Sequence, residues 1–149
     1  MSVVPSQILY LEHGATRLYA EAIQIMAARH LCWARPTLLI QGLPVIQGLP
    51  EGSAQDLRQE AIAAAVQNPE DSKLQICDLE GGPDLIWPLD LFQIACDIDF
   101  FSLLIRIKMS PEDSSYRDRS SELNAFIHSF WHTDGSGFHA SDLPSLDVR

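Results

Sequence analysis

The residues of this sequence that could bind a metal ion are three histidines near its end. His128 and His132 lie four positions apart on a predicted helix, and His139 follows them. Imidazoles at that spacing share one helix face and can bind Zn²⁺ or Ni²⁺. A catalytic zinc helix carries a glutamate beside its first histidine, but Ser129 stands there, and no third ligand lies at a characteristic spacing. We therefore predict ordinary solvated histidines and no metal site.

Paired carboxylates are the other side chains that could do chemistry, as a general acid and a general base. Asp97 and Asp99 lie two positions apart, and Asp84 and Asp90 flank a predicted strand. No sequence feature brings either pair into one cleft. The chain also lacks a Gly-x-Ser-x-Gly nucleophile motif, a phosphate-binding loop and a dinucleotide fingerprint. The sequence thus predicts no catalytic residue and no cofactor, and it favours a protein that is not an enzyme.

The charge of the chain narrows the class of partner. Its 149 residues include 20 acidic and 10 basic ones, for a net charge of −10. The basic residues are scattered, whereas binding to nucleic acid or to an anionic membrane needs them clustered. Six acids and no base lie between Asp78 and Asp99. This run is read either as a solvated face that keeps the protein soluble or as a surface that steers a basic partner.

The cysteines and the beginning of the chain bear on localisation. Cys32, Cys77 and Cys96 are odd in number, form no Cys-x-x-Cys pair and sit beside apolar residues. We expect buried thiols, which fits the reducing cytoplasm. No basic region followed by an apolar stretch marks a signal peptide, and no apolar run reaches the length of a membrane span. The predicted localisation is cytoplasmic.

The first part of the chain is predicted to be β-structure. Residues 8–12 read as a strand that ends at the Gly14 turn, and residues 17–41 read as a long hairpin. A helix over residues 17–29 stays open as the alternative. Pro36, in the second half of the hairpin, indicates an edge or a bulged position, because proline cannot donate a ladder hydrogen bond.

The remainder of the chain alternates helices and strands. Residues 42–52 form a Gly/Pro-rich connection, and a helix capped by Ser53 is expected over residues 53–68. Two alternating runs, 73–79 and 85–92, flank Gly81-Gly82 and read as a second hairpin. The other expected segments are helix or strand over 98–108, a helix over 115–132, and a flexible tail over 138–149.

These elements predict one α+β domain spanning residues 1–149. Two antiparallel β-hairpins form a curved sheet or a small open barrel, with a helix inserted between them and a C-terminal helix packed against it. Two readings compete for the aromatic residues of the last helix and for Trp87: they form the core, or some of them form a groove or an oligomer interface. The candidate interaction surface comprises Asp84, Trp87, Asp90, Phe126, Phe130 and Trp131.

Two blocks of sequence resemble a small conserved protein family of cyanobacteria. They are residues 11–36, with Leu11-Glu12-His13-Gly14 and Leu31-Cys32-Trp33-Ala34-Arg35-Pro36, and residues 78–92. The family has no assigned enzymatic activity. The chain departs from it at Glu80, where members usually carry arginine, and in the longer stretch from Gly42 to Ser72.

The resemblance and the charge together imply a function. We expect a non-enzymatic cytosolic protein, cyanobacterial in origin, that acts in interaction, assembly or a chaperone-like role. Carboxysome and photosynthetic assembly factors are the class that the resemblance raises. The expected partner is a protein, and a homodimer is open. The alternative is a small-ligand-binding or enzymatic domain with a pocket between the sheet and the C-terminal helix.

Overall fold

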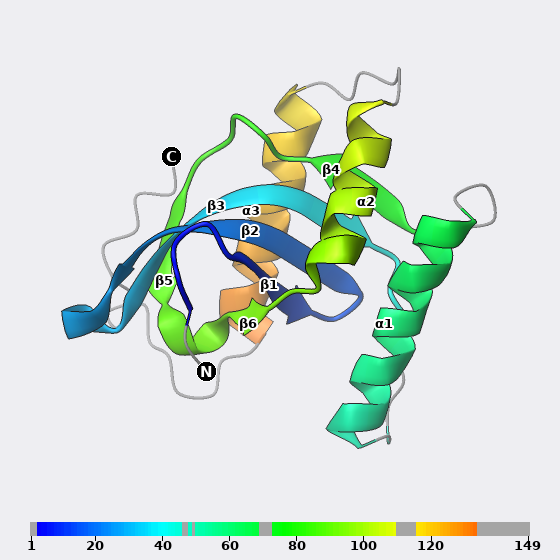
Figure 1. Ribbon diagram of the computed structural model, residues 1–149, viewed down its shortest axis with the longest axis horizontal. Helices are drawn as coiled ribbons and strands as arrows, with labels where there is room; N and C mark the ends of the chain where they lie inside the picture. The colour runs from blue at the N-terminus through cyan, green and yellow to red at the C-terminus, as the bar shows by residue number, and fades with distance from the viewer. Residues whose placement is uncertain (1–2, 46–47, 49, 69–72, 110–115, 134–149) are drawn as a thin grey trace.

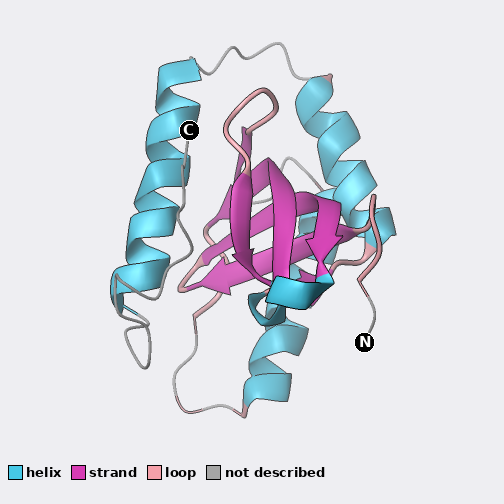
Figure 2. Cartoon of the chain, turned by 90° about the vertical axis from the view of Figure 1, so that its left-hand side faces the viewer, coloured by secondary structure: helices cyan, strands magenta, loops and turns pink. Residues whose placement is uncertain are grey.

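The protein is a six-stranded antiparallel sheet with helices on both faces (Figures 1 and 2). This computed structural model describes residues 3–45, 48, 50–68, 73–109 and 116–133, and the element counts below refer to them. The sheet is not closed, and three α-helices accompany it, so the α+β prediction is confirmed. Its strands are β1 (Ile8–His13), β2 (Thr16–Met26), β3 (Leu31–Gln41), β4 (Gln75–Asp78), β5 (Leu85–Pro88) and β6 (Gln93–Ile94). Its helices are α1 (Glu51–Gln67), α2 (Asp97–Lys108) and α3 (Tyr116–Thr133).

The long hairpin of β2 and β3 is the centre of the sheet. Its strands pair along their whole length around a short 3-10 turn, η1 (Ala27–Arg29), and His30 closes the turn with a φ of 57°. β1 pairs with the other side of β2, and β6 pairs with β1. The helical alternative for residues 17–29 is therefore wrong. Its apolar run reads ambiguously because β2 is covered on both faces and need not alternate strictly.

The predicted second hairpin is also wrong. β4 pairs with Leu38–Gln41 and β5 with Leu31–Ala34, both antiparallel to β3, and β4 does not pair with β5. β4 and β5 therefore run in the same direction along one edge of β3. Between them the chain leaves that edge after β4 and returns to it at β5. Gly81, with a φ of 88°, shapes this excursion and does not reverse the chain. Two short strands can share one edge because β3 is 11 residues long.

Pro36 lies where the sheet can tolerate it. On one side it faces the register shift at Tyr19 and Ala20 of β2. On the other side it falls between the four β3 residues paired with β5 and the four paired with β4. The predicted bulge is confirmed, and neither β4 nor β5 pairs with Pro36, which cannot donate a ladder hydrogen bond.

The three helices lie where they were predicted or left open, but the start of the first one differs from the prediction. α1 begins at Glu51, with Pro50 at its N-cap, so Ser53 lies within the first turn and not at the cap. Residues 98–108, left open between helix and strand, form α2, with acids in its first turn and bases in its last. That order suits the helix dipole. α3 matches the predicted C-terminal helix, whereas the predicted tail, residues 138–149, lies outside the described residues.

Each face of the sheet has its own core, and Figure 2 shows helices on either side of the sheet. Leu11, Leu18 and Ala34 belong to the cluster that includes Phe126 and Phe130 of α3. Tyr19, Leu38 and Ile40, on the other face, pack with Ile62 of α1 and with Phe100 and Leu103 of α2. The sheet is thus the middle layer of three.

The three thiols have different environments and form no disulfide with one another. Cys32 is buried in β3, and Cys77 is half-buried in β4, whereas Cys96 is exposed at the N-cap of α2. The expectation of three buried thiols is wrong for Cys96, because a helix cap lies at the surface. Burial raises the pKa of the Cys32 thiol to about 11.

Thiol reactivity tests this arrangement. At pH 8 Cys96 should react first with a disulfide reagent, and Cys32 at least about 100-fold more slowly, because the thiolate is the nucleophile and Cys32 is buried and almost wholly protonated. Cys96→Ser should remove the fast phase. The reaction is measured by the absorbance of the thiol that the reagent releases. A fast phase that survives this substitution would contradict the assigned exposure.

Candidate functional site

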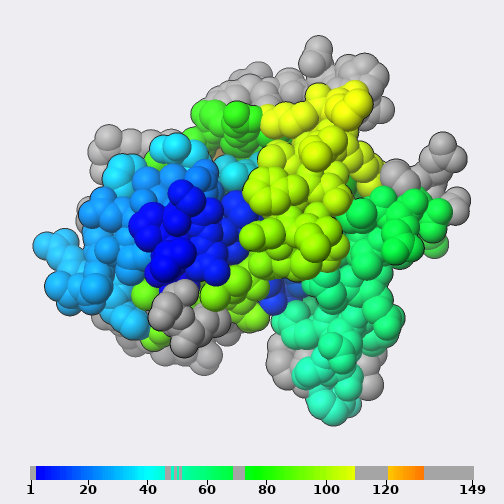
Figure 3. Space-filling model, in the orientation of Figure 1, coloured from blue at the N-terminus to red at the C-terminus, as the bar shows by residue number. Residues whose placement is uncertain are grey.

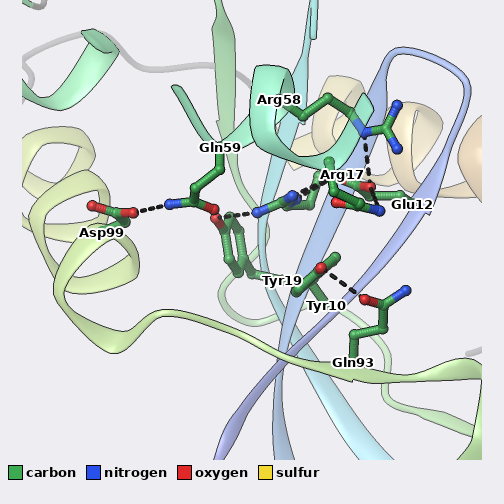
Figure 4. A network of polar contacts seen from close by, with 9 residues as sticks. Tyr10, Glu12, Arg17, Tyr19, Arg58, Gln59, Gln93 and Asp99 are labelled. Carbon is green, nitrogen blue, oxygen red and sulfur yellow. Dashed lines mark hydrogen bonds and ion pairs between the residues drawn. The ribbon is translucent and has the colours of Figure 1, made fainter. Parts of the chain in front are cut away.

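A buried ionic network between the sheet and α1 is the main polar feature of the interior (Figure 4). The Glu12 carboxylate accepts from Arg17 Nε at 2.6 Å and pairs with Arg17 Nη2 at 2.5 Å. It also accepts from Arg58 Nε and Gln55 Nε2, both at 3.0 Å. Arg17 is 2% exposed and is the only buried charged residue in the described chain. One carboxylate therefore joins two guanidinium groups away from water.

The hairpin of β1 and β2 creates this network. Glu12 and Arg17 are directly opposed across the two strands, as are Tyr10 and Tyr19. The Arg17 guanidinium lies 4.0 Å from the centre of the Tyr10 ring, and its Nη1 donates to the Tyr19 hydroxyl at 3.2 Å. The cation–π contact and the hydrogen bond add to the ion pair.

Two contacts extend the network to neighbouring elements. The Tyr10 hydroxyl donates to Gln93 of β6 at 2.9 Å. Gln59 of α1 donates its amide N–H to Asp99 of α2. Arg58 and Gln59 are consecutive residues of one helix, so the network links the sheet with both helices on its face (Figure 4).

Burial and neighbouring charges shift the pKa of three side chains in the network. Burial works to lower the pKa of Arg17, but attraction from Tyr19 and Glu12 outweighs it and raises the pKa above its ordinary value. Burial likewise raises the pKa of Tyr10 and of Tyr19. At neutral pH these arginine and tyrosine side chains keep their protons, and none of them can act as a general base.

Sequence reasoning missed this site. The signal for it was a glutamate and an arginine placed symmetrically about the Gly14 turn, which puts them opposite each other in a tight hairpin. The contribution of Arg58 could not be found in this way, because it depends on how α1 packs on the sheet.

The aromatic residues predicted for an interaction surface form an internal cluster. Trp87 is fully buried, and Phe126 and Phe130 are 5% and 7% exposed. The Trp87 ring centre lies 5.4 Å from that of Phe130 and 4.9 Å from that of Trp131, which is half-buried. For these residues the core interpretation holds, and Trp87, Phe126 and Phe130 are not available as a docking surface. The apolar face of α3 is used to cover one face of the sheet.

The two aspartates of the predicted surface each interact with side chains of the same chain. Asp84 accepts from Trp33 Nε1 at 2.9 Å and from Arg35 Nε at 3.1 Å. These bonds tie the excursion between β4 and β5 to β3. Asp90 pairs with His30 Nε2 at 2.7 Å, and both side chains are exposed. Asp84 therefore holds the fold, and Asp90 remains on the surface.

The histidines and the other aspartates that the sequence analysis considered do not come together in one site among the described residues. His128 and His132 are exposed, with tilted rings whose centres are 4.1 Å apart, and His139 lies outside the described residues. No group of three metal-ligating side chains occurs among the residues that the structure covers. Asp97 and Asp99 lie in the first turn of α2, whereas Asp84 directly precedes β5 and Asp90 lies in the short 3-10 segment Leu89–Leu91.

An exposed apolar stripe runs along α2 and was not predicted. It consists of Ile98, Phe101, Ile105 and Met109, spaced by three, four and four positions. Their exposed fractions are 76%, 49%, 59% and 78%. These are four of the six large exposed apolar side chains in the described chain. The opposite side of α2 contributes Phe100 and Leu103 to the core, so the helix is apolar on two faces.

The described residues line several cavities, three of which lie beside the helices. One of about 360 Å³ lies beside the stripe, between α2 and the sheet, and includes Phe101, Leu104 and Arg35. One of about 300 Å³ lies between the β1–β2 turn and α3, lined in part by His13, Glu122 and Ser129. The third, about 450 Å³, lies beside α1 and is lined mainly by small and apolar residues. Asp97, Asp99 and His128 line none of these three.

Comparison with known proteins identifies no relative: no protein family, no curated protein and no solved structure matches the chain. No helix in the described part is long and apolar enough to cross a bilayer.

Removing the central carboxylate tests the network. Glu12→Gln should lower the free energy of unfolding by about 3 kcal/mol, because two buried or half-buried guanidinium groups lose their counterion. Denaturant unfolding measures this loss, and hydrogen exchange should show reduced protection of α1.

The matched control is Asp90→Asn, the same carboxylate-to-amide change in an exposed ion pair, which should leave stability unchanged. Equal losses in the two variants would show that burial of Glu12 does not hold the fold.

Proposed function

We propose that this protein is a non-enzymatic protein-interaction or assembly domain whose docking face is the exposed stripe of α2. The observation that carries the proposal is the stripe itself: four large apolar side chains lie in line on one helix face and are about half or more exposed. Isolated exposed apolar residues need no explanation, whereas a contiguous row of them marks an interaction site.

The remaining features support interaction over catalysis. Glu12, Arg17 and Arg58 engage one another, and Asp84 is occupied by Trp33 and Arg35. An amphipathic helix that presents anchors at positions i, i+3 and i+7 is a recurrent docking element. Cytoplasmic localisation and membership of the cyanobacterial family remain parts of this proposal, supported by the thiols and by the two sequence blocks.

A second candidate function has one observation in its favour. The cavity between the β1–β2 turn and α3 has polar groups at its edge, with Gln41 donating to Glu122 at 2.6 Å. It lies where the alternative function expects a pocket, between the sheet and the C-terminal helix. A small molecule retained by the purified protein and displaced by Ser129→Phe would favour this function.

Stripe variants test the docking face. Ile98→Ser with Ile105→Ser should abolish recovery of a stoichiometric partner in affinity capture from the native cell. Stability should change by less than about 0.5 kcal/mol for each substitution, because both side chains are exposed. Quantitative mass spectrometry of the captured proteins measures the loss.

Val45→Ser is the matched control, since Val45 is 56% exposed and lies outside α2. Capture that is identical for the wild type, the stripe variant and the control would contradict a docking role for α2.

A further inference from the structure

On both sides of the stripe, an acidic residue lies near the beginning of α2 and a basic residue lies near its end. One side carries Asp97 in the first turn and Lys108 at the C-terminal end of α2. The other side carries Asp99 in the first turn and Arg106 in the last. An acidic beginning and a basic end therefore border an apolar centre on each side.

This pattern has approximate two-fold symmetry about residue 103. Ile98 and Met109 are nearly equidistant from that point, as are Phe101 and Ile105. Asp97 mirrors Lys108, and Asp99 mirrors Arg106, about almost the same point. If a second copy of the helix is laid antiparallel on the first about this point, apolar residues meet apolar ones and each acid meets a base.

We infer that the occupant of the stripe is a second copy of this chain, bound through an antiparallel α2–α2 contact. The inference rests on the proposed function, because it assigns the partner of the same docking face. A two-fold dimer uses one surface patch twice, so the patch must be complementary to itself. The α2 stripe meets this condition in its side-chain types and in its charges.

The charges select the antiparallel arrangement over the parallel one. Parallel helices related by a two-fold axis would bring Asp97 beside Asp99 and Lys108 beside Arg106 of the other copy, and like charges in contact are unfavourable. Lys108 also contacts Asp78 and Glu80 of its own chain, which hold its side chain at this end of the helix, and its side chain stays 40% exposed. Arg106 donates to the backbone carbonyl of Ala65, so its contact within the chain is with a neutral group.

Among the residues that the structure describes, the surroundings of α2 leave room for this contact. Figure 3 shows α2, in yellow-green, on the surface of the molecule beside the N-terminal segment and α1. The cavity of about 360 Å³ opens beside Phe101 and Leu104, with Ile8 and Pro36 in its lining. It offers apolar surface next to the stripe for the bulky side chains of the second copy. A single helix pair is smaller than a standard interface, so the dimer should be weak, with a dissociation constant in the micromolar range.

Sedimentation equilibrium of the purified chain, from about 1 µM to about 500 µM, tests the dimer. The wild type should pass from monomer to dimer over this range. Ile105→Glu should raise the dissociation constant at least tenfold with an unchanged circular dichroism spectrum, whereas Val45→Glu should leave it unchanged. A wild type that stays monomeric throughout would overturn the inference. In that case, stripe-dependent capture of another protein would still support the proposed function.

A pair of charge reversals separates local contact from overall repulsion. Asp97→Lys and Asp90→Lys both change the net charge from −10 to −8, so each reduces repulsion between copies equally. We expect Asp97→Lys to weaken the dimer several-fold, because it faces Lys108 of the second copy. Asp90→Lys should leave the dimer unchanged or strengthen it. Equal effects of the two reversals would overturn the proposed charge pairing.

Disulfide trapping decides the direction of the helices. In a Cys96→Ser background, Ile98→Cys alone should not cross-link, because the two thiols would lie about 16 Å apart along the antiparallel pair. Met109→Cys alone should not cross-link either. An equimolar mixture of the two variants should give a disulfide-linked dimer on non-reducing gels. Cross-linking of each variant alone, and not of the mixture, would show a parallel pair.

Discussion

The pairing of β2 with β3 is the constraint on which the rest of the structure depends. The two strands are 11 residues long each and pair at ten positions, and every other strand attaches to one of their outer edges directly or through β1. The sheet built on this strand pair has two faces, and the three helices cover them. Because both faces are buried, β2 contains a run of consecutive apolar residues where a half-exposed strand would alternate. β3 accommodates Pro36 because two short strands share its edge and leave a gap between them.

The ionic network fixes the position of α1 on the sheet. A buried arginine is costly unless its charge is compensated, and Arg17 is compensated by Glu12 across the hairpin. Glu12 has oxygens left for further donors, and Arg58 and Gln55 of α1 supply them. The network thus gives α1 a specific position on a face where apolar contact alone, through residues such as Ile62, would tolerate sliding.

The two helical layers differ in how completely they are used. On the α3 side, the aromatic rings of Trp87, Phe126 and Phe130 pack together, and no described side chain of α3 is among the large exposed apolar ones. On the other side, α2 covers the sheet with Phe100 and Leu103 and still presents four apolar residues outward. The charges of α2 are acidic in its first turn and basic in its last turn, at the two ends of this outward apolar surface.

The sequence by itself determined the α+β class, the long hairpin, the helices near residues 53–67 and 115–132, and the absence of familiar catalytic motifs. These properties depend on local patterns: apolar periodicity, glycine and proline positions, and motif spacing. Only the tertiary structure decided that Gly81 serves an excursion between two strands on one edge and not a hairpin. It also decided that residues 98–108 are helical, that Trp87 is interior, and that Arg58 reaches Glu12. Each of these depends on contacts between segments distant in sequence. A buried aromatic residue and a docking residue have the same local pattern, and only the packing of the chain shows which of the two is covered.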